Sequence, residues 1–159
     1  MAYLNKATTA ADICKKLRLK HKDDLWFEEV RLSSGFAWQG RIDFMSLDPA
    51  PSTGNLAIAY EVKVTKSDFK KDTYDKQRGA RLYSDRFYYI APAGLLEKKD
   101  IPDWAGFMEV GWRPGRYGNT EPYLEIKELV PSPKRDKDSP SWGLVCSLIR
   151  NSKRQGGST

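Results

Sequence analysis

Three side chains on two neighbouring apolar segments are of the types that bind a metal ion and cleave a phosphodiester bond. Glu61 and Lys63 lie two positions apart at the end of one apolar run, and Asp43 lies in the run before it, flanked by Ile42 and Phe44. Carboxylate oxygens are the hard ligands that Mg²⁺ prefers. A neighbouring ammonium can orient or help deprotonate the attacking water and stabilise the charge that develops on a phosphate. We therefore take this triplet as the candidate catalytic centre, with Mg²⁺ as the expected cofactor and Mn²⁺ as its expected substitute.

The spacing of an acid two residues before a lysine is not specific by itself, so its context has to decide. It occurs at Glu61/Lys63, Asp68/Lys70, Glu97/Lys99 and Glu125/Lys127. Only a strand places residues i and i+2 side by side on one face. The second pair falls in an expected helix and the third in a charged loop. The fourth has only Glu109 as an upstream acid, and prolines rather than a basic helix follow it. The first pair is therefore favoured.

Two further groups are candidate metal ligands. The backbone carbonyl of Val62, between the acid and the lysine, is a natural third ligand. Glu29, on the preceding strand, is as well explained by an additional ligand or supporting group as by an ordinary exposed glutamate. A surface salt bridge between Glu61 and Lys63 would also explain their spacing. The apolar strand, the upstream acid and the basic segment downstream favour the catalytic interpretation.

A strongly basic segment follows the triplet. Between Lys63 and Arg86 eight basic residues are opposed by four aspartates, and the whole chain has a formal charge of +6. Such an excess favours a polyanionic partner, and we expect DNA, held mainly through its phosphates. The expected DNA contacts are Lys66, Lys70, Lys76, Gln77, Arg78 and Arg81. The segment at 8–22 is also basic, and a solvated helix face explains its charges slightly better than a DNA contact does.

The elements that must position these residues follow from hydrophobic periodicity and from turn residues. We expect helices at 8–22, 65–83 and 139–152, the first capped by Thr8 or Thr9 and the second by Thr65. In the last helix, Trp142, Val145 and Ile149 are spaced for one face. Strands are expected at 25–32, 41–47, 56–64, 86–91, 105–112 and 122–130. The first three form an antiparallel meander.

The third strand has two contrasting faces. Ala57 and Ala59 share a face with Glu61 and leave room around its carboxylate, whereas the large side chains point into the core from the other face. The order of strands and helices predicts an α/β fold with a mixed sheet flanked by helices. We expect one domain over residues 1–152 and a flexible tail at 153–159.

Composition narrows the classes of protein. At 159 residues, with 40% hydrophobic and 30% charged residues, the chain can enclose one core. It has no apolar run long enough for a bilayer and no signal peptide, so no membrane is expected. Cys14 and Cys146 form neither a disulfide framework nor a zinc motif, so we expect an intracellular, cytoplasmic protein of bacterial or phage origin. His21, the only histidine, is expected to be solvated.

Three segments carry a resemblance to a known family. They are Gly40–Asp43, then Glu61–Phe69, then Tyr83–Pro92. Together they resemble DNA-repair proteins of the MmcB type, which belong to the PD-(D/E)XK nuclease superfamily. The resemblance spans residues 29–92. It implies a restriction-endonuclease-like fold and a metal-dependent DNA nuclease acting in repair, recombination or phage DNA metabolism.

The resemblance also implies roles for individual residues. Asp43 and Glu61 match the metal-binding acids, and Lys63 matches the catalytic lysine. Asp68 and Phe69 match a structural helix start, whereas Asp85 and Arg86 match positions without an assigned role. The chain departs from the family in a proline-rich loop at 48–55 and after Pro92. The DNA structure that is cut and the choice between endonuclease and exonuclease therefore stay open.

Two other functions remain as alternatives. One is a catalytically inactive nucleic-acid-binding module on the same scaffold, against which the intact triplet argues. The other is a protein-interaction adaptor that docks through aromatic residues, including Trp104, Trp112 and Trp142. No phosphate-binding glycine loop is present, so no nucleotide cofactor is expected. The oligomeric state does not follow from the sequence.

Overall fold

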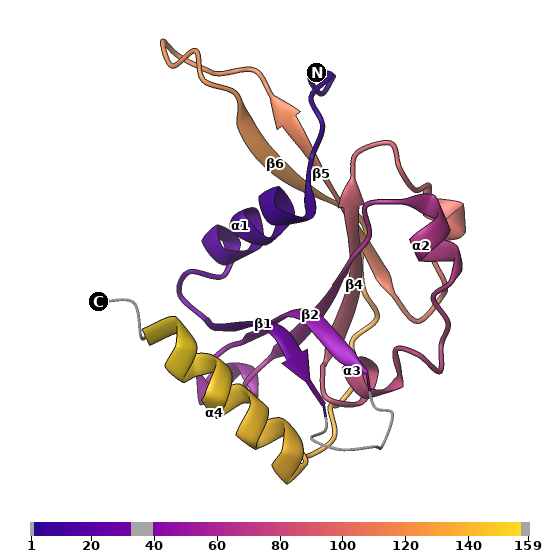
Figure 1. The fold of residues 1–159 in the computed structure, drawn as a ribbon, viewed down its shortest axis with the longest axis vertical. Helices are drawn as coiled ribbons and strands as arrows, with labels where there is room; N and C mark the ends of the chain where they lie inside the picture. The colour runs from indigo at the N-terminus through magenta and orange to yellow at the C-terminus, as the bar shows by residue number, and fades with distance from the viewer. Residues whose placement is uncertain (1, 33–39, 157–159) are drawn as a thin grey trace.

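A single sheet with helices on both of its faces forms the structure (Figure 1), which is a computed structural model. It describes residues 2–32 and 40–156, with the backbone alone at 153–156. The elements in chain order are α1 (Ala10–Lys20), β1 (Leu25–Arg31), β2 (Arg41–Leu47), η1 (Pro51–Thr53), β3 (Ala57–Val62), α2 (Lys66–Lys70), α3 (Arg78–Leu82), β4 (Arg86–Pro92), η2 (Lys98–Asp100), β5 (Gly106–Arg113), β6 (Tyr123–Val130) and α4 (Trp142–Gly156).

The sheet is mixed, as the sequence predicted. Among the described residues it has six strands in the order β1-β2-β3-β4-β5-β6. The first three strands pair antiparallel and form the expected meander. Strands β4 and β5 run parallel to β3, and β6 returns antiparallel to β5. This is the α/β, restriction-endonuclease-like arrangement that we expected. Because β3, β4 and β5 are parallel, their carboxyl ends meet at one edge of the sheet.

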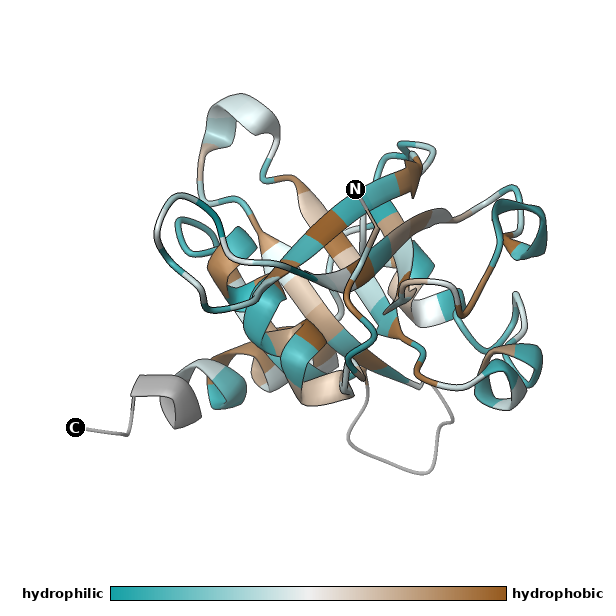
Figure 2. Cartoon of the chain, turned by 90° about the horizontal axis from the view of Figure 1, so that it is seen from above, coloured by the Kyte–Doolittle hydropathy of each residue, from teal (hydrophilic) through white to brown (hydrophobic). Residues whose placement is uncertain are grey.

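Both faces of the sheet are covered. Helix α1 packs Ile13 and Leu17 onto a cluster that includes Tyr60, while α3 and α4 cover the other face, where Ala57 and Ala59 are buried. Hydrophobic segments accordingly lie along the central strands in Figure 2. We expected only the large side chains of β3 to face a core, and this was wrong. Strands in a parallel arrangement are generally buried on both faces, so the small alanines are packed under helices.

The basic segment after β3 is not one helix, as predicted over 65–83, but two short ones. Thr65 caps α2 through its hydroxyl, as expected. The helix ends at Lys70, and the intervening turn lets the Asp72 side chain point inward, where it is only 1% exposed. The Thr73 hydroxyl accepts a hydrogen bond from the amide of Lys76. Asp and Thr favour such side-chain-to-backbone bonds over helix interiors, which accounts for the break.

The apolar positions that we noted on the last helix do not mark the buried face of α4. Trp142 is 83% exposed and Ile149 is 52% exposed, whereas Leu144 is buried in the core. Two of the three apolar residues that we noted are therefore exposed, and Val145 is half-buried. The helix also continues past Ser152 to Gly156, into the segment expected to be a flexible tail. The rest of that segment, residues 157–159, lies outside the described residues.

Asp85 and Arg86 have structural roles. The Asp85 carboxylate accepts hydrogen bonds from the amide of Ala57 at 2.8 Å and from the Lys137 ammonium at 2.9 Å. Although burial opposes it, these bonds hold the pKa of Asp85 below its usual value. Arg86 donates to the carbonyl of Ser132. Both residues thus fix the segment after β6 against the sheet.

Two expectations from composition concern the state of the cysteines and the presence of a helix that could span a membrane. Both Cys14 and Cys146 are free thiols. Among the residues that the structure describes, no helix combines the length and apolar character needed to cross a membrane.

His21 is buried, so our expectation of a solvated histidine was wrong. Its side chain is 6% exposed, and its ring nitrogens lie 2.8 Å from a carboxylate oxygen of Asp24 and 2.8 Å from the hydroxyl of Tyr60. Burial lowers the pKa of His21, although Asp24 acts in the opposite direction. The polar residues next to His21 in the sequence gave no sign that its ring is buried against Tyr60.

The His21 environment predicts a pH dependence of stability. Since its pKa is lower in the folded than in the unfolded chain, the unfolded chain binds more protons as the pH falls below about 6.5. The free energy of unfolding should therefore decrease from pH 7.5 towards pH 5. Urea denaturation at several pH values, compared with His21→Gln, measures the effect. A loss of stability with acid that is equally steep in the variant would contradict this account.

Candidate active site

Strands β2 and β3 separate at Asp43. Their pairing ends with Phe44 opposite Tyr60, so the next residues, Asp43 and Glu61, face each other across the gap with their side chains on the same side. The carboxylate of Asp43 accepts a hydrogen bond from the amide of Val62 at 3.0 Å. It thus replaces the backbone acceptor that β2 no longer supplies. The separation of the strands frees the Val62 amide, and the hydrogen bond from this amide fixes the Asp43 side chain.

The neighbouring strand is irregular at the same level. Glu29 has φ of 51°, a left-handed conformation that is uncommon outside glycine. The pairing of β1 with β2 skips Glu29 and Asp43. Val30 and Phe27, three positions apart, lie in the same hydrophobic cluster, which strict alternation along a strand does not allow. This distortion interrupts the regular pairing of β1 with β2 beside Asp43.

Glu61 and Lys63 form a buried ion pair rather than a surface one. Their side chains are 11% and 3% exposed, and Lys63 Nζ lies 3.1 Å from Glu61 Oε1. Burial, and then the charge of Asp43, raise the pKa of Glu61 to about 7, against the opposing effect of Lys63. Burial lowers the pKa of Lys63, but the carboxylates of Glu61 and Asp72 outweigh it and raise the pKa above its usual value. Lys63 is therefore an ammonium.

Asp72 completes this ionic centre, and our sequence analysis missed it. A carboxylate oxygen of Asp72 lies 3.5 Å from Lys63 Nζ, and the Gln77 amide donates to both of its oxygens at 2.9 and 2.8 Å. Lys76 Nζ is 3.8 Å away. Asp68 is more peripheral, at 4.0 Å from Lys63. A signal was present, because Asp68 and Asp72 are spaced i and i+4 within an otherwise basic segment.

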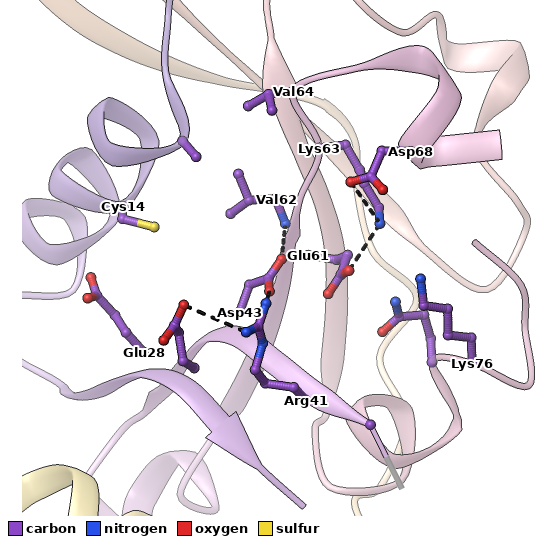
Figure 3. A pocket seen from close by; sticks show the side chains of 14 residues that line it. Cys14, Glu28, Arg41, Asp43, Glu61, Val62, Lys63, Val64, Asp68 and Lys76 are labelled. Atoms are coloured by element: carbon purple, nitrogen blue, oxygen red, sulfur yellow. Dashed lines mark hydrogen bonds and ion pairs between the residues drawn. The ribbon is translucent and has the colours of Figure 1, made fainter. Parts of the chain in front are cut away.

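All three residues of the predicted triplet line one pocket of about 710 Å³ (Figure 3). Cys14 of α1 forms one wall, and Lys76 lies on the opposite side. The other residues that line it are Ala10, Glu28, Glu29, Gly40, Arg41, Val62, Val64, Asp68 and Gln77. The structure thus brings together the residues that the sequence selected. By contrast, Glu125 of the Glu125/Lys127 pair, which we did not favour, forms an ion pair with Arg113 at 2.6 Å.

The donor atoms of the pocket are of the type that magnesium takes. Asp43 and Glu61 offer carboxylate oxygens on one side of the sheet. The Val62 amide points towards Asp43, so the Val62 carbonyl, which shares its strand edge, points the same way. No cluster of three or more His, Cys, Asp or Glu side chains that could hold a metal occurs among the described residues. Magnesium is commonly held by only one or two carboxylates together with water and substrate phosphate.

Two other pocket residues contribute less to this donor set. Glu29 lines the pocket, but its side chain is 73% exposed and lies 3.7 Å from Arg41, which also reaches Asp43 at 3.4 Å. The position fits a supporting role better than the direct ligand role that we considered. Burial raises the pKa of the Cys14 thiol to about 11, so it is a neutral group in the wall.

The expected DNA contacts divide into two groups. Lys66, Lys70, Lys76 and Arg78 are exposed, as such contacts require. Gln77 lines the pocket but is buried, and its amide donates to Asp72, so the structure gives it a supporting role beside Asp72. Arg81 donates to the carbonyl of Tyr74 and lies over the ring of that residue, 3.3 Å from its centroid. Its guanidinium therefore holds the segment together.

The position of Asp72 predicts a stability effect. Replacing Asp72 with Asn removes the charge that Lys63 and Gln77 face in a buried site, and should lower the free energy of unfolding by about 1–3 kcal/mol. The exposed Asp75 of the same segment provides the matched control, and Asp75→Asn should change it by less than about 0.5 kcal/mol. Urea denaturation measures both. Equal effects of the two substitutions would show that the Asp72 contacts contribute nothing.

Comparison with known proteins gives evidence on the fold alone. No family model matches the chain, and no curated protein matches it either. A solved structure of a protein of unknown function from Silicibacter pomeroyi, SPO1766, is similar, with a TM-score of 0.60 and 17% sequence identity over 88% of this chain and 82% of that one. At this identity the similarity establishes a shared fold.

Proposed function

We propose that the chain is a metal-dependent DNA nuclease of the PD-(D/E)XK type, with Asp43, Glu61 and Lys63 as its catalytic residues. The observation that carries the proposal is their convergence in one pocket, from two strands and across the point where those strands separate. A pair of carboxylates beside a buried ammonium is an expensive arrangement, because burying charges costs several kcal/mol per ion. Such arrangements are typical of functional sites.

The residues of the pocket would have separate roles in hydrolysis. Asp43 and Glu61 would hold Mg²⁺, with the Val62 carbonyl at the same edge. The bound ion would supply Lewis acidity towards a phosphate oxygen and a more acidic water. Lys63, fixed by Glu61 and Asp72, can donate a hydrogen bond to the attacking water or to a phosphate oxygen and stabilise the developing negative charge.

Exposed cations next to the pocket support a DNA substrate. Lys76 lies at its rim, and Lys66, Lys70 and Arg78 are exposed on the same segment. Side chains of this kind neutralise backbone phosphates without reading sequence. The free thiols favour a reducing, intracellular setting, where repair, recombination or phage DNA metabolism would provide the substrate.

Cleavage of labelled DNA tests the proposal. The chain should cut DNA in the presence of Mg²⁺ or Mn²⁺ and fail to do so with EDTA. Asp43→Asn keeps an oxygen acceptor for the Val62 amide but removes a charged ligand, so we expect the rate to fall by about a hundredfold or more. The test is more informative than Lys63→Ala. Because Lys63 is buried between carboxylates, its removal should also destabilise the fold.

Asp48→Asn is the matched control, because Asp48 lies just beyond the other end of β2 and its carboxylate accepts a hydrogen bond within the loop, from the amide of Ala50. It should cleave like the parent chain. DNA binding without metal-dependent cleavage would replace the proposal with the inactive binding module. Absence of DNA binding even at low salt would favour the protein-interaction adaptor. Cleavage that survives Asp43→Asn unchanged would refute the assignment of the site.

A further inference from the structure

The hairpin formed by β5 and β6 extends past the edge of the sheet where the pocket lies. Pairing between β4 and β5 ends at Val110, but β5 continues to Arg113 and remains paired with β6. Because β3, β4 and β5 are parallel, the free part of β5 leaves the sheet at the same edge to which β3 delivers Glu61 and Lys63. Figure 1 shows the hairpin projecting beyond α1 and β4.

The amino-terminal segment braces this hairpin. The amide of Leu4 donates to the carbonyl of Trp112 at 2.8 Å, and the indole of Trp112 donates to the carbonyl of Ala7 at 3.2 Å. Tyr3 lies against Gly111 so closely that a Cβ at that position would be 2.3 Å from its ring. A side chain at residue 111 would therefore displace Tyr3. The hairpin is fixed to the segment that precedes α1.

That same segment leads to the pocket. It continues through the Thr9 cap into α1, and Ala10 and Cys14 of this helix form a wall of the pocket. Residues 4–10 therefore connect the hairpin to the wall of the pocket that holds the candidate catalytic residues. A strand of nucleic acid lying on the surface of these residues would reach both places.

The tip of the hairpin presents an aromatic ring to solvent. Tyr117 is fully exposed, with a relative accessibility of 102%. Its φ of 47° is unusual for a residue with a large side chain. The turn is closed by a hydrogen bond from the Asn119 amide to the Arg116 carbonyl at 3.0 Å, and Gly118 takes φ of 81°. The strained backbone directs the Tyr117 ring away from the hairpin, and such strain is common at binding sites.

Cations and aromatic rings alternate along this surface. Lys6 Nζ lies 3.7 Å from the centroid of the Trp112 ring, and the Arg116 guanidinium lies 5.3 Å from that of Tyr123. Lys6 and Arg116 are exposed. Proteins that bind single-stranded nucleic acid combine cations that follow the phosphates with aromatic side chains on which bases stack. Except at its ends, the bases of an intact duplex are stacked on one another and offer no free face to such a ring.

We propose that the β5–β6 hairpin binds an unpaired DNA strand, with Tyr117 stacking on a base and Lys6 and Arg116 contacting phosphates. The proposal rests on the proposed nuclease function for the other end of the surface, and it specifies the substrate class of that site. The substrate is single-stranded DNA or DNA with an unpaired end, which passes along residues 4–10 into the pocket.

Equilibrium binding in EDTA tests the hairpin without cleavage. Fluorescence anisotropy with a labelled single-stranded oligonucleotide should show tighter binding than with a blunt duplex of the same sequence. Tyr117→Ala should weaken single-strand binding by at least about fivefold, the lower limit for loss of one stacked base. Tyr117→Phe should bind like the parent, because it keeps the ring. Trp142→Ala is the control for loss of an exposed aromatic side chain, since α4 lies far from the hairpin (Figure 1).

The outcomes separate this proposal from the nuclease assignment. Loss of single-strand affinity in Tyr117→Ala, with Tyr117→Phe and Trp142→Ala unchanged, supports the hairpin contact. DNA binding by the parent that Tyr117→Ala leaves intact overturns the hairpin contact and leaves the nuclease proposal standing. If the parent prefers the blunt duplex, the substrate class is wrong. If it binds no DNA, both proposals fall together.

Discussion

The structure around the pocket depends on keeping the Lys63 ammonium buried between carboxylates. An isolated buried charge would cost several kcal/mol, so Glu61 and Asp72 must both approach it, at 3.1 and 3.5 Å. Glu61 does so from the same strand. Asp72 does so only because the chain leaves helical geometry after α2, and Gln77 then satisfies the remaining acceptor sites of its carboxylate. The break in the predicted helix thus allows this charge pairing.

The other half of the pocket depends on a break in the sheet. Regular pairing of β2 with β3 would occupy the Val62 amide with backbone and leave no gap at this level. Because pairing ends at Phe44, the Asp43 carboxylate takes that amide and faces the same space as Glu61. The left-handed Glu29 on β1 lies at the same level. A helix break on one side and a strand separation on the other together open a polar pocket at the edge of a well-packed sheet.

Much of the fold was predictable from the sequence, because strands and capped helices carry local signals. Strand β2 was predicted with its observed bounds, and Thr65 was identified as a cap from its spacing to Asp68. The triplet could also be selected, since Glu61 and Lys63 end an apolar strand. Contacts between residues far apart in the sequence could not be predicted from local patterns. These contacts include that of Asp72 with Lys63 and that of Tyr60 with the buried His21. The buried face of α4 could not be identified from the sequence either, because periodicity does not say which face of a helix meets the sheet.

The most direct test of the central claim is a crystal structure of the chain soaked with Mn²⁺, in which anomalous scattering locates the ion independently of any activity. The account predicts an anomalous peak in the pocket within bonding distance of a carboxylate oxygen of Asp43 and one of Glu61, near the carbonyl of Val62. A peak located elsewhere, or a pocket without one at Mn²⁺ concentrations that support DNA cleavage, would contradict it.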